Sequence, residues 1–168
     1  MSNVFLKLAE LLFRGDSSQE LAFVVILALG RVMHLHPPTE LLNEVLSQMV
    51  INVLNQPQQQ TAMMCLSVLR CLYDTTRFTR IHTAFLVQNL KLISVLQNIL
   101  DKNLDEKVSI TAVQILKEIA ASGFHLPMIE HAFLSSLMRV VQQPDSPIYH
   151  PTLDLLRQLV ETSSYNST

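Results

Sequence analysis

Apolar residues recur at intervals of three and four along most of the chain, which is the period of an α-helix. Proline, glycine and short polar stretches interrupt this pattern. The uninterrupted segments predict eight helices, over 2–14, 17–35, 39–55, 58–74, 78–100, 105–122, 127–142 and 147–163. Ser17 and Asp105 are expected N-caps, and Gly15 and Gly123 are expected C-caps. Because the connecting segments are short, consecutive helices are expected to pack antiparallel.

The second, fourth, sixth and eighth predicted helices share one register. Each contains a seven-residue stretch that is apolar at its first, third, fourth and seventh positions. Leucine stands at the fourth position in all of them: Leu29, Leu69, Leu116 and Leu156. Unrelated amphipathic helices would share the helical period but not this register. The sequence therefore predicts a helical hairpin of roughly 40 residues, present four times, with Leu69, Leu116 and Leu156 buried at equivalent depths.

The odd-numbered helices repeat as well. Val50, Val53 and Leu54 correspond to Leu137, Val140 and Val141, and Leu96, Ile99 and Leu100 fit the same frame. The stretch 92–122, LISVLQNILDKNLDEKVSITAVQILKEIAAS, resembles an armadillo repeat, with its second helix, a short acidic turn and its third helix. By this resemblance 79–89 would be the short first helix, so the helix over 78–100 would be broken near Gln88 and Asn89. The other hairpins are similar to two-helix HEAT units.

The resemblance to the armadillo and HEAT families implies an all-α fold, a right-handed α-solenoid of four helical hairpins. The last helices of such hairpins line a concave surface, which usually binds an extended peptide or a partner helix. At least three stacked units are needed to bury a continuous core, and four are predicted here. We expect one repeat domain over residues 1–163 and a short polar tail over 164–168.

The helical wheel locates the stripe that would face a partner. On the helix over 58–74, Cys65, Val68, Leu69 and Leu72 share one face, so the opposite face is expected to be exposed. The candidate partner-binding residues on this stripe and its repeats are Ser67, Arg70, Cys71, Gln114, Lys117, Glu118, Asp154, Arg157 and Gln158.

The nuclear-import branch of the armadillo family holds a basic peptide with ladders of Trp and Asn on this stripe. The chain contains no tryptophan, so we reject that function. One cation per hairpin remains, in Arg70, Lys117 and Arg157. This column would meet an acidic partner segment. The alternative is ordinary solvated charge with local salt bridges.

Two further segments are secondary candidates. The helix over 17–35 is apolar on every face between residues 21 and 29, which indicates a contact with a partner chain or a second copy unless the first helix covers it. Its candidate residues are Phe23, Val24, Leu27 and Arg31. Arg77 and Arg80 flank an aromatic residue and would suit an acidic ligand, the alternative being a solvated turn.

Composition agrees with a folded all-α chain, since hydrophobic residues make up 49%, charged residues 15%, and only 3 residues are glycine. The 12 basic and 14 acidic residues give a net charge of −2, which argues against nucleic acid as the partner. The longest apolar run, 21–30, is shorter than the roughly 20 residues that span a membrane. Cys65 and Cys71 lie too far apart on one helix to pair, and free thiols favour the cytoplasm or nucleus over secretion.

No motif for catalysis emerges. The histidines do not cluster with other ligand residues, and the glycines form no phosphate loop. We therefore expect a non-catalytic scaffold or adaptor that binds another protein and uses no metal or cofactor. The alternative is a helical bundle of the apoptosis-regulator type, with a groove for an amphipathic helix. That fold needs a long apolar central hairpin, which the sequence lacks.

Overall fold

The computed structural model describes residues 39–78, 80–102 and 105–166, together with Lys7, Val24, Val25 and Ala28. Within these ranges the chain is all-α and has no strand. The α-helices are α3 (Thr39–Met49), α4 (Ala62–Phe78), α5 (Arg80–Gln88), α6 (Leu92–Lys102), α7 (Glu106–Ala121), α8 (His131–Val141) and α9 (Tyr149–Asn166). A π-helical segment, Val50–Leu54, continues α3, and 3₁₀ turns over Pro57–Gln59 and Leu126–Ile129 precede α4 and α8. The helices expected over 2–14 and 17–35, with Gly15, Ser17 and Leu29, fall outside the described residues.

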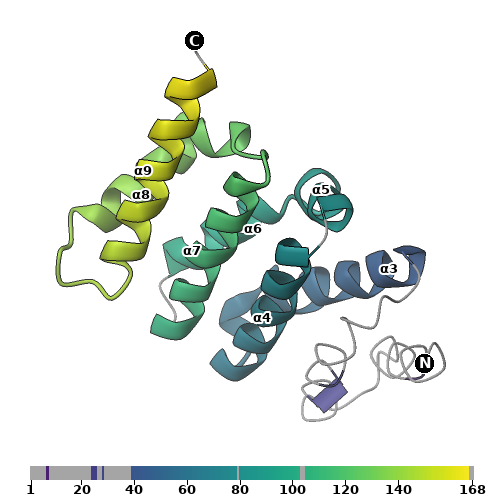
Figure 1. Ribbon diagram of the computed structural model, residues 1–168. Helices are drawn as coiled ribbons and strands as arrows, with labels where there is room; N and C mark the ends of the chain where they lie inside the picture. The colour runs from purple at the N-terminus through teal and green to yellow at the C-terminus, as the bar shows by residue number, and fades with distance from the viewer. Residues whose placement is uncertain are drawn as a thin grey trace.

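The helices from α3 to α9 form two layers. One layer contains α3 with its π-helical continuation, then α6, then α8, and the other contains α4, α7 and α9 (Figure 1). Within the second layer α7 packs against α4 on one side and α9 on the other. The π-helical segment of the first layer also packs against α4, and in the same way α6 packs against α7 and α8 against α9. Successive helices of each layer therefore lie side by side.

The ends of α7 follow the predicted capping. The carboxylate of Asp105 accepts hydrogen bonds from the backbone N–H groups of Lys107 and Val108, at 3.0 and 3.2 Å. These bonds satisfy two of the donors that a helix start leaves open. Gly123 has φ 95°, which is the left-handed geometry that a residue without a Cβ adopts after a helix end. The helix predicted over 105–122 is confirmed.

The helix predicted over 78–100 is wrong as one continuous element, and the break near Gln88 and Asn89 is confirmed. The helix α5 ends at Gln88. Lys91 then turns the chain with φ 54°, and α6 begins at the next residue. The result is the short helix followed by a longer hairpin that the armadillo resemblance implied.

The predicted end of the preceding helix at residue 74 is also wrong, because α4 continues to Phe78. Asp-Thr-Thr is typical of a helix end in sequence. Here the hydroxyl of Thr75 donates a hydrogen bond to the backbone carbonyl of Cys71 at 2.8 Å, and the hydroxyl of Thr76 donates one to the backbone carbonyl of Tyr73 at 2.9 Å. Since these bonds satisfy both buried hydroxyls within the helix, the threonines do not end it.

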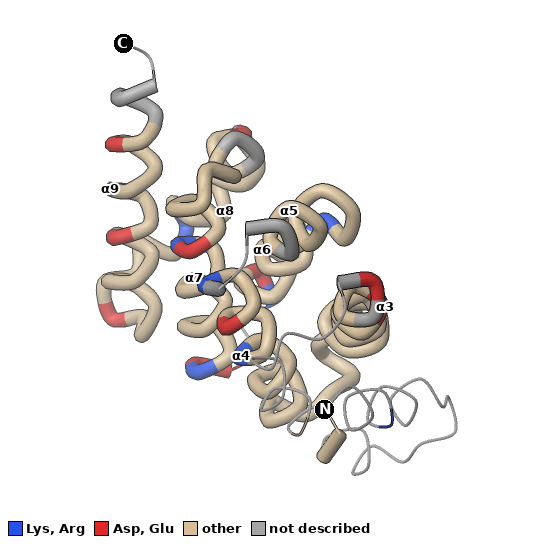
Figure 2. The backbone as a smooth tube through the Cα atoms, turned by 45° about the vertical axis from the view of Figure 1, so that its right-hand side comes forward, with Lys and Arg blue, Asp and Glu red and all other residues tan. Residues whose placement is uncertain are grey.

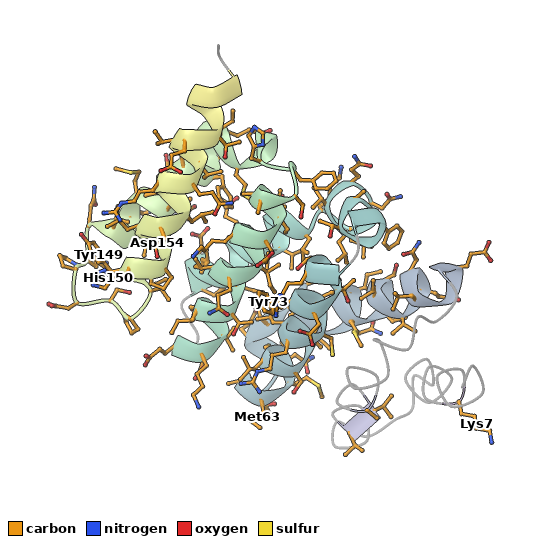
Figure 3. All side chains as sticks on the ribbon, viewed as in Figure 1. Lys7, Met63, Tyr73, Tyr149, His150 and Asp154 are labelled. Atoms are coloured by element: carbon orange, nitrogen blue, oxygen red, sulfur yellow. The ribbon has the colours of Figure 1, made fainter. Side chains whose placement is uncertain are left out.

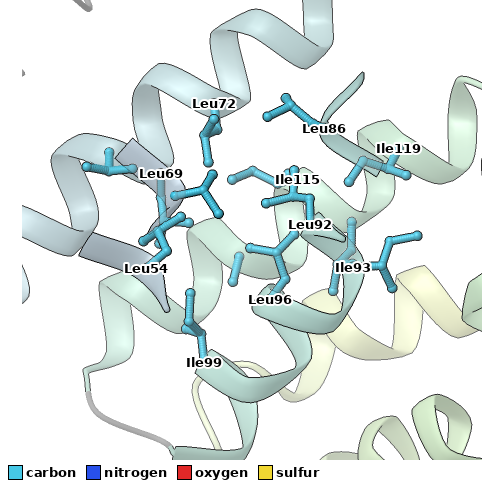
Figure 4. Packing of buried hydrophobic residues seen from close by; sticks show 14 of the residues in the cluster. Leu54, Leu69, Leu72, Leu86, Leu92, Ile93, Leu96, Ile99, Ile115 and Ile119 are labelled. Carbon is cyan, nitrogen blue, oxygen red and sulfur yellow. The ribbon is translucent and has the colours of Figure 1, made fainter. Parts of the chain in front are cut away.

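The core runs between the two layers. In the close view, Leu69 of α4, Ile115 of α7 and Leu96 of α6 converge with their neighbours (Figure 4). Leu69 and Leu116 are both fully buried, as the shared register predicted. Leu156 is only partly buried, so the expectation of equal depth is wrong for the last hairpin. The reason is that no described helix lies beyond α9 to cover that side.

Candidate interaction surface

The second layer exposes a band of polar residues across three helices, which we call the polar strip. It consists of Arg70 and Asp74 on α4, Gln114, Lys117 and Glu118 on α7, and Asp154, Arg157 and Gln158 on α9. Most of these side chains are exposed, while Lys117, Glu118 and Gln158 are half-buried. Because α4, α7 and α9 are neighbours, residues at the same register position form rows that cross the helices.

Two candidates on this stripe are placed differently from the prediction. Ser67 is 6% exposed and Cys71 is 4% exposed, so both are buried and neither can meet a partner. The hydroxyl of Ser67 donates to the carbonyl of Met63 at 2.8 Å. The wheel argument treated α4 as a surface helix with one buried face. The exposed sector of α4 is narrower than that argument assumed, and it contains Arg70, Asp74 and Arg77.

A direct bond joins α7 to α9 within the polar strip. The side-chain amide of Gln158 donates to the backbone carbonyl of Lys117 at 3.1 Å. Gln158 is therefore engaged in holding the two helices together and is only partly available to a partner. The bond joins α9 to α7 at the residue next to Arg157, and its acceptor belongs to the backbone of Lys117.

Both signs of charge occur on the strip. The guanidinium of Arg157 lies 3.9 Å from the carboxylate of Asp154 on the same helix. Both groups are well exposed, so this ion pair contributes little stability. Arg70, Lys117 and Arg157 share one register position, and Asp154 lies beside the row that they form. Charges of both signs are spread over several helices and do not gather into a patch of one sign (Figure 2).

The secondary candidates are only partly within the described residues. Val24 is exposed, while Phe23, Leu27 and Arg31 lie outside the described part of the chain. Arg77 lies in the last turn of α4, with its guanidinium carbon 5.4 Å from the centroid of the Tyr73 ring. Arg80 begins α5, and its side chain is outside the described part. Of this pair, only the side chain of Arg77 therefore lies within the described part of the chain.

Cys65 and Cys71 form no disulfide, as the spacing predicted, and both are buried. Burial and, to a lesser extent, the nearby charge of Asp74 raise the pKa of Cys71 to about 12. Burial also raises the pKa of Cys65, although its backbone hydrogen bond works in the opposite direction. Since the thiolate is the nucleophile and the metal ligand, neither position suits catalysis or metal binding.

A second contact between hairpins lies in the first layer and was not predicted from the sequence. The side-chain amide of Gln97 on α6 donates to the hydroxyl of Ser136 on α8 at 3.0 Å. Arg139 donates to the same hydroxyl at 3.2 Å and lies 3.5 Å from the carboxylate of Asp101. These four side chains are polar and occupy ordinary helical positions, so only their spatial neighbours reveal the contact.

Among the described residues, no group of three or more His, Cys, Asp or Glu side chains could hold a metal ion. None of the described helices combines the length and the apolar character that crossing a membrane requires. The chain matches no model of a known protein family, no curated protein and no solved structure.

Proposed function

We propose that the chain is a right-handed α-solenoid of the armadillo and HEAT kind. Three features support this architecture: the two-layer stack, the shared register of α4, α7 and α9, and the unit of a short helix and a hairpin formed by α5, α6 and α7. In such arrays each unit packs mainly on its neighbours, so equivalent helices form a continuous surface.

We further propose that the protein is a non-catalytic scaffold or adaptor that binds another protein across the polar strip. The observation that carries this proposal is the row of Arg70, Lys117 and Arg157 on three adjacent helices. The hydrogen bond from Gln158 joins two of these helices, α7 and α9. A binding surface on rigid, mutually packed helices presents its groups in fixed geometry. Two buried cysteines that form no disulfide support a location in the cytosol or nucleus.

The chemistry of the strip favours an extended segment or helix with acidic residues at intervals. Neighbouring helices lie about 8–10 Å apart, so the three cations would extend over about 20 Å. Asp74 and Asp154 lie beside this row and would repel acidic residues that are out of register. The arrangement therefore selects a partner by charge spacing and orientation as well as by charge sign.

Affinity capture from native extract tests the proposal. The bait variants are the wild type, a strip variant with Arg70→Glu, Lys117→Glu and Arg157→Glu, and a control with Lys91→Glu and Lys102→Glu. The control residues are exposed and lie at the two ends of α6, in the other layer. We expect proteins that the wild type and the control retain and the strip variant loses. Equal capture by all three baits would contradict the proposal.

A further inference from the structure

The loop that joins α8 to α9 carries a serine between two prolines. Of the 7 prolines in the chain, Pro147 alone follows a serine or a threonine, and the residue before it is Ser146. Pro144 lies two residues before the serine, so the loop contains the sequence Pro-Asp-Ser-Pro. Residues 143–147 belong neither to the apolar core nor to the polar strip. The fold and the proposed binding surface therefore leave this sequence unexplained.

The loop is accessible from outside. Residues 142–145 and Pro147 are exposed, and Ser146 is half-buried. Figure 1 shows the loop projecting at the left edge of the molecule, at one end of the hairpin of α8 and α9. Tyr149 and His150, the first two residues of α9, lie at the same outer edge (Figure 3). A second protein can therefore approach Ser146 without contacting α3 or α4.

Local backbone bonds hold the loop in its turns. The N–H of Ser146 donates to the carbonyl of Gln143 at 2.9 Å, and the N–H of Tyr149 donates to the carbonyl of Ser146 at 3.0 Å. An enzyme that binds the serine in an extended segment has to open these bonds. The first core residue after the loop is Ile148, which is 5% exposed. Since the whole Pro-Asp-Ser-Pro sequence precedes Ile148, the segment can straighten while that side chain stays in the core.

The proline after the serine indicates which enzymes would use this site. Proline has no backbone N–H, so an enzyme pocket without a hydrogen-bond acceptor takes it and leaves no donor unpaired. Any other residue would bury an unpaired N–H in such a pocket, which therefore selects proline. Protein kinases with this pocket are the proline-directed kinases. We propose that Ser146 is a phosphorylation site for a proline-directed protein kinase.

The reaction needs ATP as its second substrate, bound with Mg²⁺ to the kinase. The Oγ atom of Ser146 forms a bond to the γ-phosphorus of ATP. The bond from that phosphorus to the oxygen that bridges it to the β-phosphorus breaks, and ADP leaves. The hydroxyl proton passes to a base of the kinase, so Ser146 becomes a phosphate monoester.

Ser146 also caps α9, but more weakly than the equivalent residue caps α7. Its Oγ atom accepts a hydrogen bond from the backbone N–H of Ile148, two residues later, at 3.4 Å. The carboxylate of Asp105 accepts from the N–H two residues later at 3.0 Å. The first turn of α7 also contains Glu106, whereas the first turn of α9 contains no acidic residue. The start of α9 therefore lacks the negative charge that stabilises a helix start.

A phosphate on Ser146 would supply this charge. It brings a charge of about −1.5 to −2 and three acceptor oxygens. They would lie beside backbone N–H groups that a helix start leaves without partners inside the helix. The neighbouring Asp145 is exposed, so its repulsion is screened by water and salt. We expect phosphorylation to raise the melting temperature by about 2–4 °C.

Incubation of the full chain with Mg²⁺-ATP and a panel of purified proline-directed kinases tests the site, with peptide mass mapping as the readout. We expect phosphate on Ser146 in the wild type and none at this position in Ser146→Ala. Pro147→Ala keeps the hydroxyl and should react about tenfold more slowly or less. The matched control is Ser122→Ala, because Ser122 is also half-buried at a helix boundary but precedes a glycine. This control should be phosphorylated on Ser146 like the wild type.

A synthetic peptide of residues 140–150 shows whether the fold hides the site. Phosphorylation of the peptide but not of the folded chain would overturn the proposal, and so would no phosphorylation of either. Equal rates for the wild type and Pro147→Ala would contradict the role of the proline. Circular dichroism checks that each variant is folded.

Thermal denaturation of the phosphorylated and unmodified chains tests the cap. We expect the rise in melting temperature given above, and a smaller rise for Ser146→Asp, which adds a single charge. Ser122→Asp is the contrasting variant, since it places the same charge at the end of α7 and should lower the melting temperature. A lower melting temperature of the phosphorylated chain would contradict the capping role. None of these tests uses a captured partner, so their failure would leave the proposed role of the polar strip untouched.

Discussion

Gln158 of α9 donates a hydrogen bond across 3.1 Å to the backbone carbonyl of Lys117, which lies 41 residues earlier on α7. Gln97 makes the corresponding contact in the other layer, to Ser136 on α8 at 3.0 Å. Each layer therefore has one glutamine that ties the α6–α7 hairpin to the α8–α9 hairpin. The apolar core holds the hairpins together, and these bonds set their register.

Removing the glutamine contacts should loosen the last hairpin by a measurable amount. We expect Gln158→Ala and Gln97→Ala each to lower the free energy of unfolding by about 0.5–1.5 kcal/mol, the usual net value of such a bond. Gln114→Ala is the control, because Gln114 is an exposed glutamine on α7. It should change stability by less than about 0.5 kcal/mol. Urea denaturation gives all three values, and equal losses in the three variants would contradict the role of the contacts.

Truncating equivalent leucines on α7 and α9 should reveal the difference in their burial. Leu116 is fully buried on α7, so Leu116→Ala should lower the free energy of unfolding by about 2–5 kcal/mol. Leu156 occupies the same register position but is partly buried. Leu156→Ala should therefore lower the free energy of unfolding by about half as much, as measured by chemical denaturation. Equal losses in the two variants would contradict the partial burial of Leu156.

Local signals in the sequence predicted much of this fold. The apolar period placed the helices, and the capping signal of Asp105 marked the start of α7. The wheel correctly placed Arg70 and Arg157 at the surface. It failed for Ser67 and Cys71 because it assumes one buried face, whereas a helix inside a stack has neighbours on several sides. The helix end predicted after Asp74 was wrong. The buried hydroxyls of Thr75 and Thr76 donate hydrogen bonds to backbone carbonyls of the same helix, which outweighs the low helix propensity of threonine.

Replacing a buried hydroxyl on α9 should stabilise the protein. The Oγ1 atom of Thr152 is fully buried and has no hydrogen-bond partner among the described residues. The same register position holds Cys65 on α4 and Ala112 on α7, both apolar. We expect Thr152→Val to raise the free energy of unfolding by about 1 kcal/mol, since it removes an unpaired polar atom and keeps the shape. Thr152→Ser keeps the hydroxyl and should lower stability, and thermal denaturation compares the two.

Cys71 should be inert in the folded protein. Its pKa is raised to about 12 by burial and by Asp74, so about one thiol in 10,000 is ionised near pH 8. In a Cys65→Ser variant, which leaves Cys71 as the one thiol, we expect no maleimide labelling under native conditions and complete labelling in guanidinium. Rapid native labelling would contradict this environment.

The same shift makes a contribution to stability that depends on pH. In the unfolded chain the thiol of Cys71 has a pKa of about 8.5. In the folded protein, burial and the nearby charge of Asp74 raise this pKa to about 12. Between these values the unfolded state binds fewer protons, so the free energy of unfolding falls by up to about 1.4 kcal/mol per pH unit. The stability of the wild type relative to Cys71→Ala should therefore fall between about pH 9 and 11, as measured by urea denaturation.

Binding of a captured partner at two salt concentrations tests the central proposal most directly. Isothermal titration at about 50 and 300 mM NaCl would compare the wild type, the strip variant with Arg70→Glu, Lys117→Glu and Arg157→Glu, and the control with Lys91→Glu and Lys102→Glu. Each exposed contact contributes about 0.2–1 kcal/mol, so three together should change the dissociation constant about tenfold at low salt. We predict weaker binding and a flatter salt dependence for the strip variant alone. Equal affinity of the strip variant and the wild type at low salt would contradict the account.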